Sequence, residues 1–194
     1  LGHFGRAQLT GLKADLLANS GQVQLAGATY RECAAAFTEI GLGEAAAEAR
    51  LYAVLLTPLD AAADLDALNR EAALSREQIG DSPTHRPLYF LAQARLSRIG
   101  KDDMQARAHL EQALTEARAS TQPEWIWRAL EARADLEAAD GQLLMAQRDR
   151  EAALLVLEEI AARLPQDLRE VYWNDERRKR LRAALPRDRH GSDR

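Results

Sequence analysis

The segment Ala26-Gly-Ala-Thr-Tyr30-Arg-Glu-Cys33-Ala34 decides the fold, because its residue pattern returns every 40 residues. Stepping forward by 40 from its first residue leads to Asp66, Ala106 and Ala146. The same step from Cys33 meets alanine three times, at positions 73, 113 and 153. A shared period of this length is typical of an array built from one supersecondary unit. The sequence therefore predicts several stacked copies of a single unit.

Large residues follow the same period. The step leads from Ala34 to Leu74, Leu114 and Leu154, and from Leu16 to Leu56, Leu96 and Leu136. Small residues allow two helices to approach, and we expect the leucines to fill the space between successive helix pairs. Asp66 departs from the small-residue rule. Either the register slips there and Leu65 turns inward, or the second unit is distorted.

The composition favours helix. The 194 residues are rich in alanine, leucine, arginine and glutamate, with only 11 glycines and 6 prolines. A net charge of -4 provides no strong field toward nucleic acid or a membrane surface. The single cysteine excludes an intrachain disulfide framework and is typical of a reducing compartment. Because no apolar run is long enough to span a bilayer and no signal peptide is seen, we expect a cytoplasmic location.

Each period holds two expected helices, which alternate as a first and a second helix in four units. The units span about residues 3–40, 43–80, 86–120 and 123–164, so the array covers residues 1–164. Capping helices are expected over 165–185 and a flexible tail over 186–194. The expected helices are Phe4–Asn19, Val23–Ile40, Glu44–Leu56, Leu59–Ile79, Pro87–Ile99, Asp102–Ser120, Pro123–Ala139, Gln142–Leu164, Gln166–Trp173 and Glu176–Leu185.

Turn and cap residues separate these helices. Ser20-Gly21 and Gly41-Leu-Gly43 are expected to end helices, because glycine adopts the left-handed conformation without strain. Thr57-Pro58 is expected to make the turn inside the second unit. Asp102 or Asp103 is a candidate N-cap, and so is Asn174 or Asp175 near the end of the chain.

The pattern resembles the tetratricopeptide repeat in its longer form of about 40 residues. The resemblance covers roughly residues 4–164, although arginine replaces the aromatic residue of the second helix at positions 70 and 150. It implies a right-handed superhelix whose first helices line a concave groove for partners. Similar arrays occur in bacterial signalling proteins, fused to kinase, ATPase or transcription-regulator modules. The residues that carry it are Gly21 with Ala26, Gly141 with Ala146, Tyr30 with Cys33, Leu110 with Ala113, and the run Gln105–Leu114.

The groove that the resemblance implies has candidate residues on three of the first helices. They combine apolar side chains with arginine at one end and glutamate at the other, a mixture that can anchor a peptide or a helix. The alternative is that the aromatic residues pack between helix pairs and the arginines are solvated. The candidates are Arg50, Leu51, Val54, Phe90, Ala94, Arg98, Trp127, Leu130, Glu131 and Glu137.

Two further clusters draw attention. Trp125 and Trp127 are two residues apart on an expected helix, so their rings point about 200° apart and only one is expected in the core.

Arg177-Arg-Lys-Arg180 with Arg182 is the basic cluster of the chain. It can neutralise phosphates, but we expect it to form the solvated outer face of a capping helix, and we expect no binding of nucleic acid. Val171, Tyr172, Trp173 and Leu181 would then cover the end of the last unit.

Residues for catalysis or metal binding are sparse. The four histidines form no metal-binding pair, and His85 has no acidic neighbour in sequence closer than Asp81. Cys33 stands where other units have alanine, so we expect a small buried thiol rather than a nucleophile. Gly41-Leu-Gly43 lacks the third glycine and the strand of a dinucleotide-binding motif. We therefore expect no catalytic residue, cofactor or metal.

The function expected from the sequence is recognition of a protein or peptide by a non-catalytic module of a bacterial regulatory or signalling protein. One alternative is a homo-oligomerisation element, such as a homodimer, formed through the alanine-rich ends of the array. Another is a small-ligand sensor domain of a transcriptional regulator or kinase. No membrane partner is expected.

Overall fold

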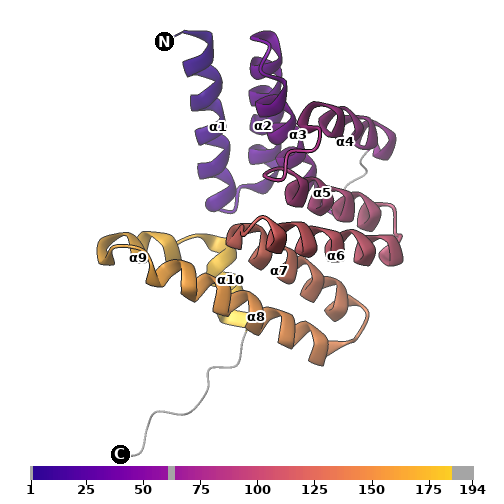
Figure 1. The fold of residues 1–194 in the computed structure, drawn as a ribbon, viewed down its shortest axis with the longest axis vertical. Coiled ribbons are helices and arrows are strands. Elements are labelled where there is room, and N and C mark those ends of the chain that lie inside the picture. The colour runs from indigo at the N-terminus through magenta and orange to yellow at the C-terminus, as the bar shows by residue number, and fades with distance from the viewer. Residues whose placement is uncertain (1, 61–63, 185–194) are drawn as a thin grey trace, which may run out of the picture.

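A computed structural model describes residues 2–60 and 64–184, and all of their regular secondary structure is α-helical (Figure 1). The all-α fold predicted from composition and periodicity is confirmed for this part of the chain. The helices are α1 (His3–Asn19), α2 (Val23–Glu39), α3 (Gly43–Leu55), α4 (Leu65–Ile79), α5 (Arg86–Ile99), α6 (Asp103–Ala119), α7 (Pro123–Ala139), α8 (Leu143–Ala162), α9 (Gln166–Trp173) and α10 (Glu176–Ala184).

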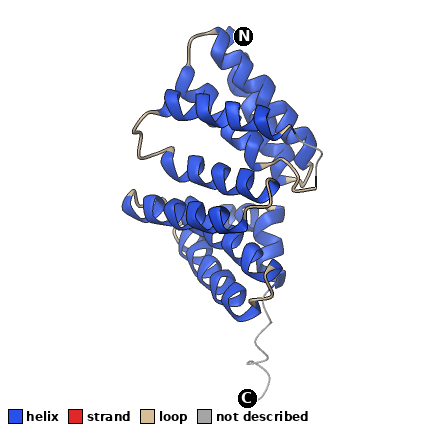
Figure 2. Ribbon diagram, turned by 90° about the vertical axis from the view of Figure 1, so that its right-hand side faces the viewer, coloured by secondary structure: helices blue, strands red, loops and turns tan. Residues whose placement is uncertain are grey.

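From α1 to α8, every helix packs against the next one along the chain. The most extensive packing joins α1 to α2, α5 to α6 and α7 to α8. α1 and α2 stand side by side at one end of the molecule, and α6, α7 and α8 lie across the other end (Figures 1 and 2). α10 returns to pack on α8. Within the described residues, no helix is both long enough and apolar enough to cross a membrane.

The turns between helices repeat one geometry at five positions that are separated by multiples of 20 residues. Residues 21, 41, 101, 121 and 141 all have positive φ, between 51° and 80°. After each of them, a backbone N–H returns to a carbonyl five residues back, as Gln22 does to Leu17 at 2.9 Å. This bond satisfies a carbonyl that the helix end leaves free. Glycine supplies the left-handed residue at 21 and 41 as predicted and also at 141, whereas Lys101 and Thr121 adopt it without glycine.

Aspartate caps start three of the helices. The carboxylate of Asp102 accepts the Gln105 N–H at 2.9 Å, and that of Asp64 accepts the Ala67 N–H at the same distance. Asp175 accepts the N–H groups of two following residues at the start of α10. Such caps satisfy donors that have no partner inside the helix. The predicted caps at Asp102 and Asp175 are confirmed.

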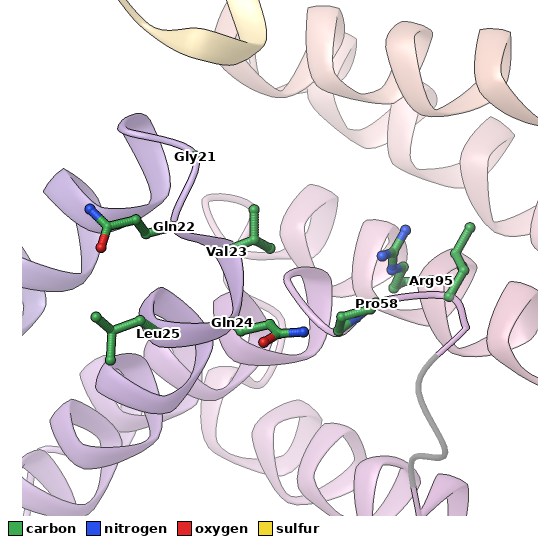
Figure 3. A pocket seen from close by; sticks show the side chains of 8 residues that line it. Gly21, Gln22, Val23, Gln24, Leu25, Pro58 and Arg95 are labelled. Atoms are coloured by element: carbon green, nitrogen blue, oxygen red, sulfur yellow. The ribbon is translucent and has the colours of Figure 1, made fainter.

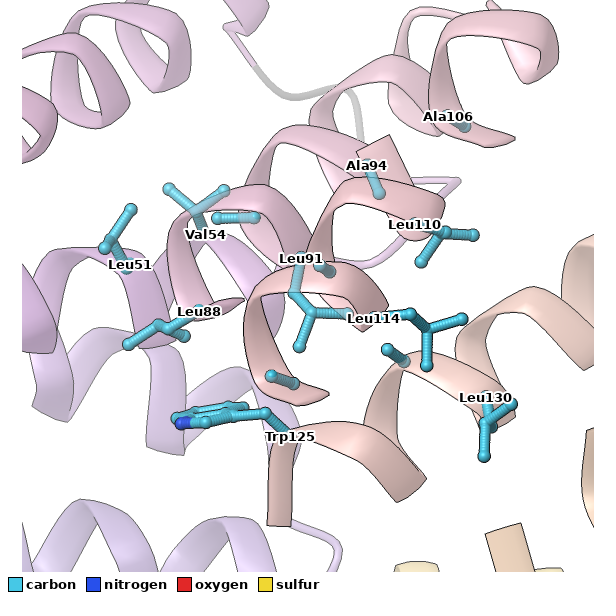
Figure 4. Close-up of a cluster of buried hydrophobic side chains, with 14 of the residues drawn as sticks. Leu51, Val54, Leu88, Leu91, Ala94, Ala106, Leu110, Leu114, Trp125 and Leu130 are labelled. Carbon is cyan, nitrogen blue, oxygen red and sulfur yellow. The ribbon is translucent and has the colours of Figure 1, made fainter. Parts of the chain in front are cut away.

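Small residues recur in the core at the predicted step. Ala26, Ala106 and Ala146 are fully buried, and Cys33 is buried like its alanine counterparts at 113 and 153. The large core cluster runs from α3 to α10, and Figure 4 shows leucines of α5, α6 and α7 gathered between these helices, with Trp125 at the edge of the cluster. A smaller cluster joins α1, α2 and α3, and Tyr52 packs against both clusters. Burial of alanine permits the close approach of helices that the sequence predicted.

The second unit departs from the predicted register. Ala73 and Leu74, expected inside, are exposed, while Leu68, Ala72, Ser75 and Ile79 are buried. Leu68 therefore takes the place of Ala26, two residues later than the 40-residue step. A register slip was one of the two alternatives, but it runs in the other direction, since Leu68 is buried while Leu65, expected to turn inward, is only half-buried. The predicted helix start at Leu59 is wrong, because Asp64 caps a helix that begins at Leu65; residues 61–63 lie outside the described residues.

The leucine series that starts at Leu16 is confirmed at only two of its four positions. Leu96 and Leu136 are buried and Leu56 is half-buried, but Leu16 is 71% exposed. The prediction fails at Leu16 because α6 covers the corresponding face of α7, whereas none of the described helices covers this face of α1.

The C-terminal helices join the large core only in part. Leu181 is buried in the large core, and Tyr172 and Trp173 pack against it. Val171, predicted to join them, is exposed. The predicted tail at 186–194 lies outside the described residues, as does Leu185, the expected end of the last helix.

Candidate functional site

A cavity of about 230 Å³ lies where the beginning of the chain meets its end. The hydrogen bond from Arg177 of α10 to Asn19 at the end of α1, at 3.1 Å, closes one side. We call this the inner cavity. Its polar and aromatic lining comes from α1, α2, α3, α7 and α10, through Asp15, Tyr30, Tyr52, Arg128, Arg177 and Arg178.

Aromatic rings form one wall of the inner cavity. The rings of Tyr30 and Tyr52 are stacked, with centroids 5.0 Å apart and an interplanar angle of 12°. Tyr52 in turn contacts Trp125 of α7, with centroids 5.9 Å apart. Contacts of this kind contribute beyond the area they bury. They bring α3 directly against α7, although the two rings lie far apart in the chain.

Arg128 lies between the aromatic wall and a carboxylate. Its guanidinium is 4.9 Å from the Trp125 ring centroid, and it forms an ion pair with Glu124 at 2.7 Å. Trp127 donates its indole N–H to the same carboxylate at 2.8 Å. Burial would raise the pKa of Glu124, but Arg128, the indole N–H and Arg178 outweigh it and lower that pKa. Glu124 therefore stays ionised, and the pair holds Arg128 in place.

Two more arginines reach the cavity from α10. Arg178 lies over the Tyr172 ring at 3.8 Å and donates to the Tyr172 carbonyl at 2.8 Å. Arg177 pairs with Asp175 at 3.2 Å, so the residue that caps α10 also orients its first arginine. Among the described residues, the Nε atoms of both arginines are buried without a hydrogen-bond acceptor. A buried donor of this kind costs free energy unless an acceptor reaches it.

Tyr30 of the aromatic wall also pairs with Asp15 of α1, which lines the same cavity. The Tyr30 hydroxyl donates a hydrogen bond to the Asp15 carboxylate. Burial and the neighbouring carboxylate both raise the pKa of Tyr30. Burial also raises the pKa of Tyr52, to about 12. Both phenols therefore stay protonated at neutral pH and do not act as bases.

Glu131 lies beyond Arg128 on α7. Burial and the nearby Asp135 raise its pKa to about 7, although Arg180, Arg177 and Arg128 act in the opposite direction. A carboxyl group of this kind changes its charge close to neutral pH.

The ten predicted groove residues do not form one surface in the structure. Arg50 hydrogen-bonds Gln78 of α4 at 2.6 Å and Thr38 of α2 at 2.8 Å, and Phe90 stacks on His109 of α6. Arg98 is half-buried, and Glu131 lies near the arginines of α10. The other six side chains are buried, because neighbouring helices pack over them: Leu51, Val54, Ala94, Trp127, Leu130 and Glu137.

Two predictions about charged and aromatic clusters are wrong. Trp125 and Trp127 are both buried, because α3 covers one ring and the arginines of α10 lie beside the other. The basic cluster is not a uniformly solvated face. Arg177 and Arg178 turn inward, and only its remaining members are exposed.

His85 has acidic partners that sequence neighbours did not reveal. Its ring nitrogens lie 3.1 Å from a Glu44 oxygen and 3.5 Å from a Glu48 oxygen, both on α3. The hydrogen bond with Glu48 raises the pKa of His85, and burial opposes it only in part. Cys33 follows the prediction: it is buried, its thiol faces the Ala7 carbonyl, and burial raises its pKa to about 11.

A second hollow, of about 690 Å³, opens between the first turn of α2 and the residues that follow α3 (Figure 3). Val23, Leu25 and Pro58 line it, and Arg95 contributes its charged group. Arg95 also donates to the Thr57 carbonyl at 2.7 Å, which fixes α5 to the end of α3. Its charged lining is a single residue, whereas four charged side chains converge on the inner cavity. The inner cavity is therefore the better candidate site.

Within the described ranges, histidine, cysteine, aspartate and glutamate nowhere gather in groups of three that could hold a metal ion. Comparison with protein-family models, with curated proteins and with solved structures found no match. The resemblance to tetratricopeptide repeats therefore stays a prediction.

Sequence reasoning missed Asp15, Tyr52 and Arg128 as site residues. A signal was present for Tyr52, because the step of 40 takes it to the apolar residues Leu12, Ala92 and Ala132. The same step takes Arg128 to Gln8, Glu48 and Leu88, which share no residue type, so no periodic signal marked Arg128. A polar aromatic residue in an otherwise apolar series marks a position with a task of its own.

Proposed function

We propose that the chain is a superhelical array of four helix-turn-helix repeats that binds a peptide segment of a partner protein at the inner cavity. It acts as a non-catalytic recognition module, and by its resemblance it belongs to a bacterial regulatory or signalling protein. The recurrence of buried residues and of left-handed turns supports the repeat architecture. Arrays of this kind create extended surfaces for binding.

The convergence of three arginines and two tyrosine rings on one cavity carries the proposal. Residues from both ends of the chain form it, so it exists only when the whole array is folded. Aromatic rings with arginine are the residues that most often anchor binding partners. The ligand that fits is a peptide that presents a carboxylate to Arg177 and Arg178 and lays an apolar group on Tyr52.

The existing ion pairs leave room for such a carboxylate. Arg128 and Arg178 share Glu124, and Arg177 holds Asp175, so these arginines are held in position before a ligand arrives. The free Nε donors of Arg177 and Arg178 would gain an acceptor. Charge-assisted bonds to arginine are stronger than neutral ones, which favours an acidic side chain or a peptide C-terminus.

A peptide-display selection tests the proposal. The immobilised chain is offered a random library of peptides, and binders are then measured by fluorescence polarisation with Arg177→Ala and with Arg180→Ala. Arg180 is the matched control, because it is the same residue type on the same helix but does not line the cavity. Loss of a charge-assisted bond should weaken binding about tenfold or more for Arg177→Ala, with little change for Arg180→Ala.

Two outcomes would count against the proposal. Selected peptides whose affinity is indifferent to Arg177 would place recognition elsewhere on the array. Selected peptides without any enrichment of carboxylate groups would remove the assigned ligand chemistry, and so would a selection that returns no specific peptide.

A further inference from the structure

The outer side of α1 carries an apolar stripe that no described helix covers. Leu9, Leu12 and Leu16 follow one another at helical spacing, and they are 50%, 58% and 71% exposed. We call them the leading stripe. A stripe of this kind on a helix normally faces a core.

The same positions are covered further along the chain. Three periods after Leu9 and Leu16 stand Ala129 and Leu136 of α7, and both are fully buried. The helix before α7 is α6, which packs against it. The leading stripe thus has the composition of a surface that receives a preceding second helix.

The opposite end of the array carries the matching surface. On α6, Arg107 pairs with Glu137 and Asp140 of α7, Glu111 pairs with Arg133 of α7, and Leu114 is buried. One step of 40 leads from these three residues of α6 to Gln147, Glu151 and Leu154 of α8, which we call the trailing face. Gln147 and Glu151 are exposed, and Leu154 is only half-buried.

The charges on the two surfaces are complementary. The ion pair between Glu111 and Arg133 joins α6 to α7. Moving Glu111 forward by one period gives Glu151, and moving Arg133 back by three periods gives Lys13 beside the leading stripe. A second copy of the chain placed as α7 is placed on α6 would therefore bring Lys13 to Glu151, Leu16 near Gln147 and Leu9 near Leu154.

We propose that a second copy docks head to tail, with the leading stripe of one chain on the trailing face of another. Each junction between copies repeats the interface that α6 and α7 form within the chain. An arrangement of this kind is heterologous, so each added copy leaves one leading stripe and one trailing face free. This head-to-tail docking does not depend on peptide binding at the inner cavity.

Charge-swap variants of exposed residues test the docking. Sedimentation velocity of the unmodified chain should show mass that increases with concentration. Lys13→Glu alone or Glu151→Lys alone should weaken association about fivefold, since each places like charges in the junction. The double variant Lys13→Glu/Glu151→Lys should restore it. Glu77→Lys reverses an exposed charge on α4, away from both surfaces, and should have no effect.

Variants that each disable one surface distinguish this docking from a symmetric dimer. Leu16→Asp removes only the leading stripe, so alone it should abolish association, with circular dichroism confirming that the exposed substitution leaves the fold intact. Glu151→Lys weakens only the trailing face. A mixture of these two variants keeps one intact junction. It joins the leading stripe of the Glu151→Lys chain to the trailing face of the Leu16→Asp chain. The mixture should therefore associate more strongly than either variant alone, and mainly as a one-to-one pair.

Three results would overturn the proposal. The first is a chain that remains monomeric at every concentration. The second is association that Glu151→Lys leaves unchanged. The third is a mixture of Leu16→Asp with Glu151→Lys in which the two variants do not pair with each other, because a symmetric contact between two leading stripes would be lost in that pair.

Discussion

Helices α1 and α7 occupy equivalent places in the chain, three periods apart, yet their surroundings differ. Ala7 and Ala14 of α1 are fully buried, as are Trp127 and Ala134 at the same positions of α7. On the other side of each helix the match ends. Leu136 is buried under α6, while Leu16 is among the most exposed apolar side chains described.

The difference shows what a neighbour contributes to a repeated sequence. A leucine that a neighbouring helix covers contributes to stability, whereas the same leucine without a covering helix remains available for association. The position in the period determines which way the side chain points. The helix on the far side determines whether that direction is core or surface.

The largest expected difference is in the free energy of unfolding after leucine truncation. Leu136→Ala should lower it by about 3 kcal/mol, because the side chain leaves a cavity in a packed core. Leu16→Ala should lower it by less than about 0.5 kcal/mol in the monomer, since solvent already surrounds that side chain. Urea titrations followed by circular dichroism measure both values. Equal losses of unfolding free energy at Leu16 and Leu136 would show that the two leucines are equally buried.

A smaller change in the free energy of unfolding is expected at a position where α1 and α7 differ in charge. Arg128→Met leaves Glu124 buried without its main partner and should destabilise the fold by about 2 kcal/mol. Gln8 is the equivalent residue of α1 and is exposed. Gln8→Met should therefore be nearly neutral, and the pair of variants can be compared by thermal unfolding. Adding Glu124→Gln to Arg128→Met should recover part of the lost stability, because it removes the unpaired buried charge. A double variant as unstable as Arg128→Met would contradict this explanation.

The smallest effect is a dependence of stability on pH. Glu131 has a folded pKa of about 7 against an ordinary value of 4.5, while its counterpart in α1, Gly11, does not titrate. The native state therefore holds a proton that the unfolded state releases, and stability falls as pH rises from about 4.5 to about 7. Glu131→Gln should gain about 1 kcal/mol at pH 8 relative to the unmodified chain and little at acidic pH.

His85 acts in the same direction over a higher range. Its pKa is raised, so the stability from its contacts with Glu44 and Glu48 is present below its ordinary pKa and is lost as pH rises through the folded value. Because His85 is present in both proteins, the difference between Glu131→Gln and the unmodified chain isolates Glu131. A difference that does not change with pH would show that Glu131 has an ordinary pKa.

Most helix boundaries could be predicted from the sequence, because they depend on local chemistry. Gly21, Gly41 and Gly141 end helices, and Asp102 starts one, through interactions with backbone atoms a few residues away. The second unit was harder. There α4 begins at Leu65 after the Asp64 cap, and its buried residues lie two positions later than the 40-residue step predicts.

The candidate site could not be predicted in the same way. Asp15, Tyr52, Arg128 and Arg177 lie far apart in the chain, and no local pattern relates them. The predicted groove assumed that one face of every first helix remains open. Trp127 lies on that face but is buried, because α10 folds back beside α7 and places Arg177 and Arg178 at its ring.

The sequence by itself determined the helices, their turns and the small residues at which they approach, since these follow from backbone geometry and from a period of 40. The tertiary structure alone decided which faces are covered. It buried both tryptophans, turned Arg177 and Arg178 inward, and left Leu16 exposed. The physical reason is that burial depends on the neighbour across an interface, and that neighbour is set by how successive helices rotate in space rather than by residues nearby in the chain.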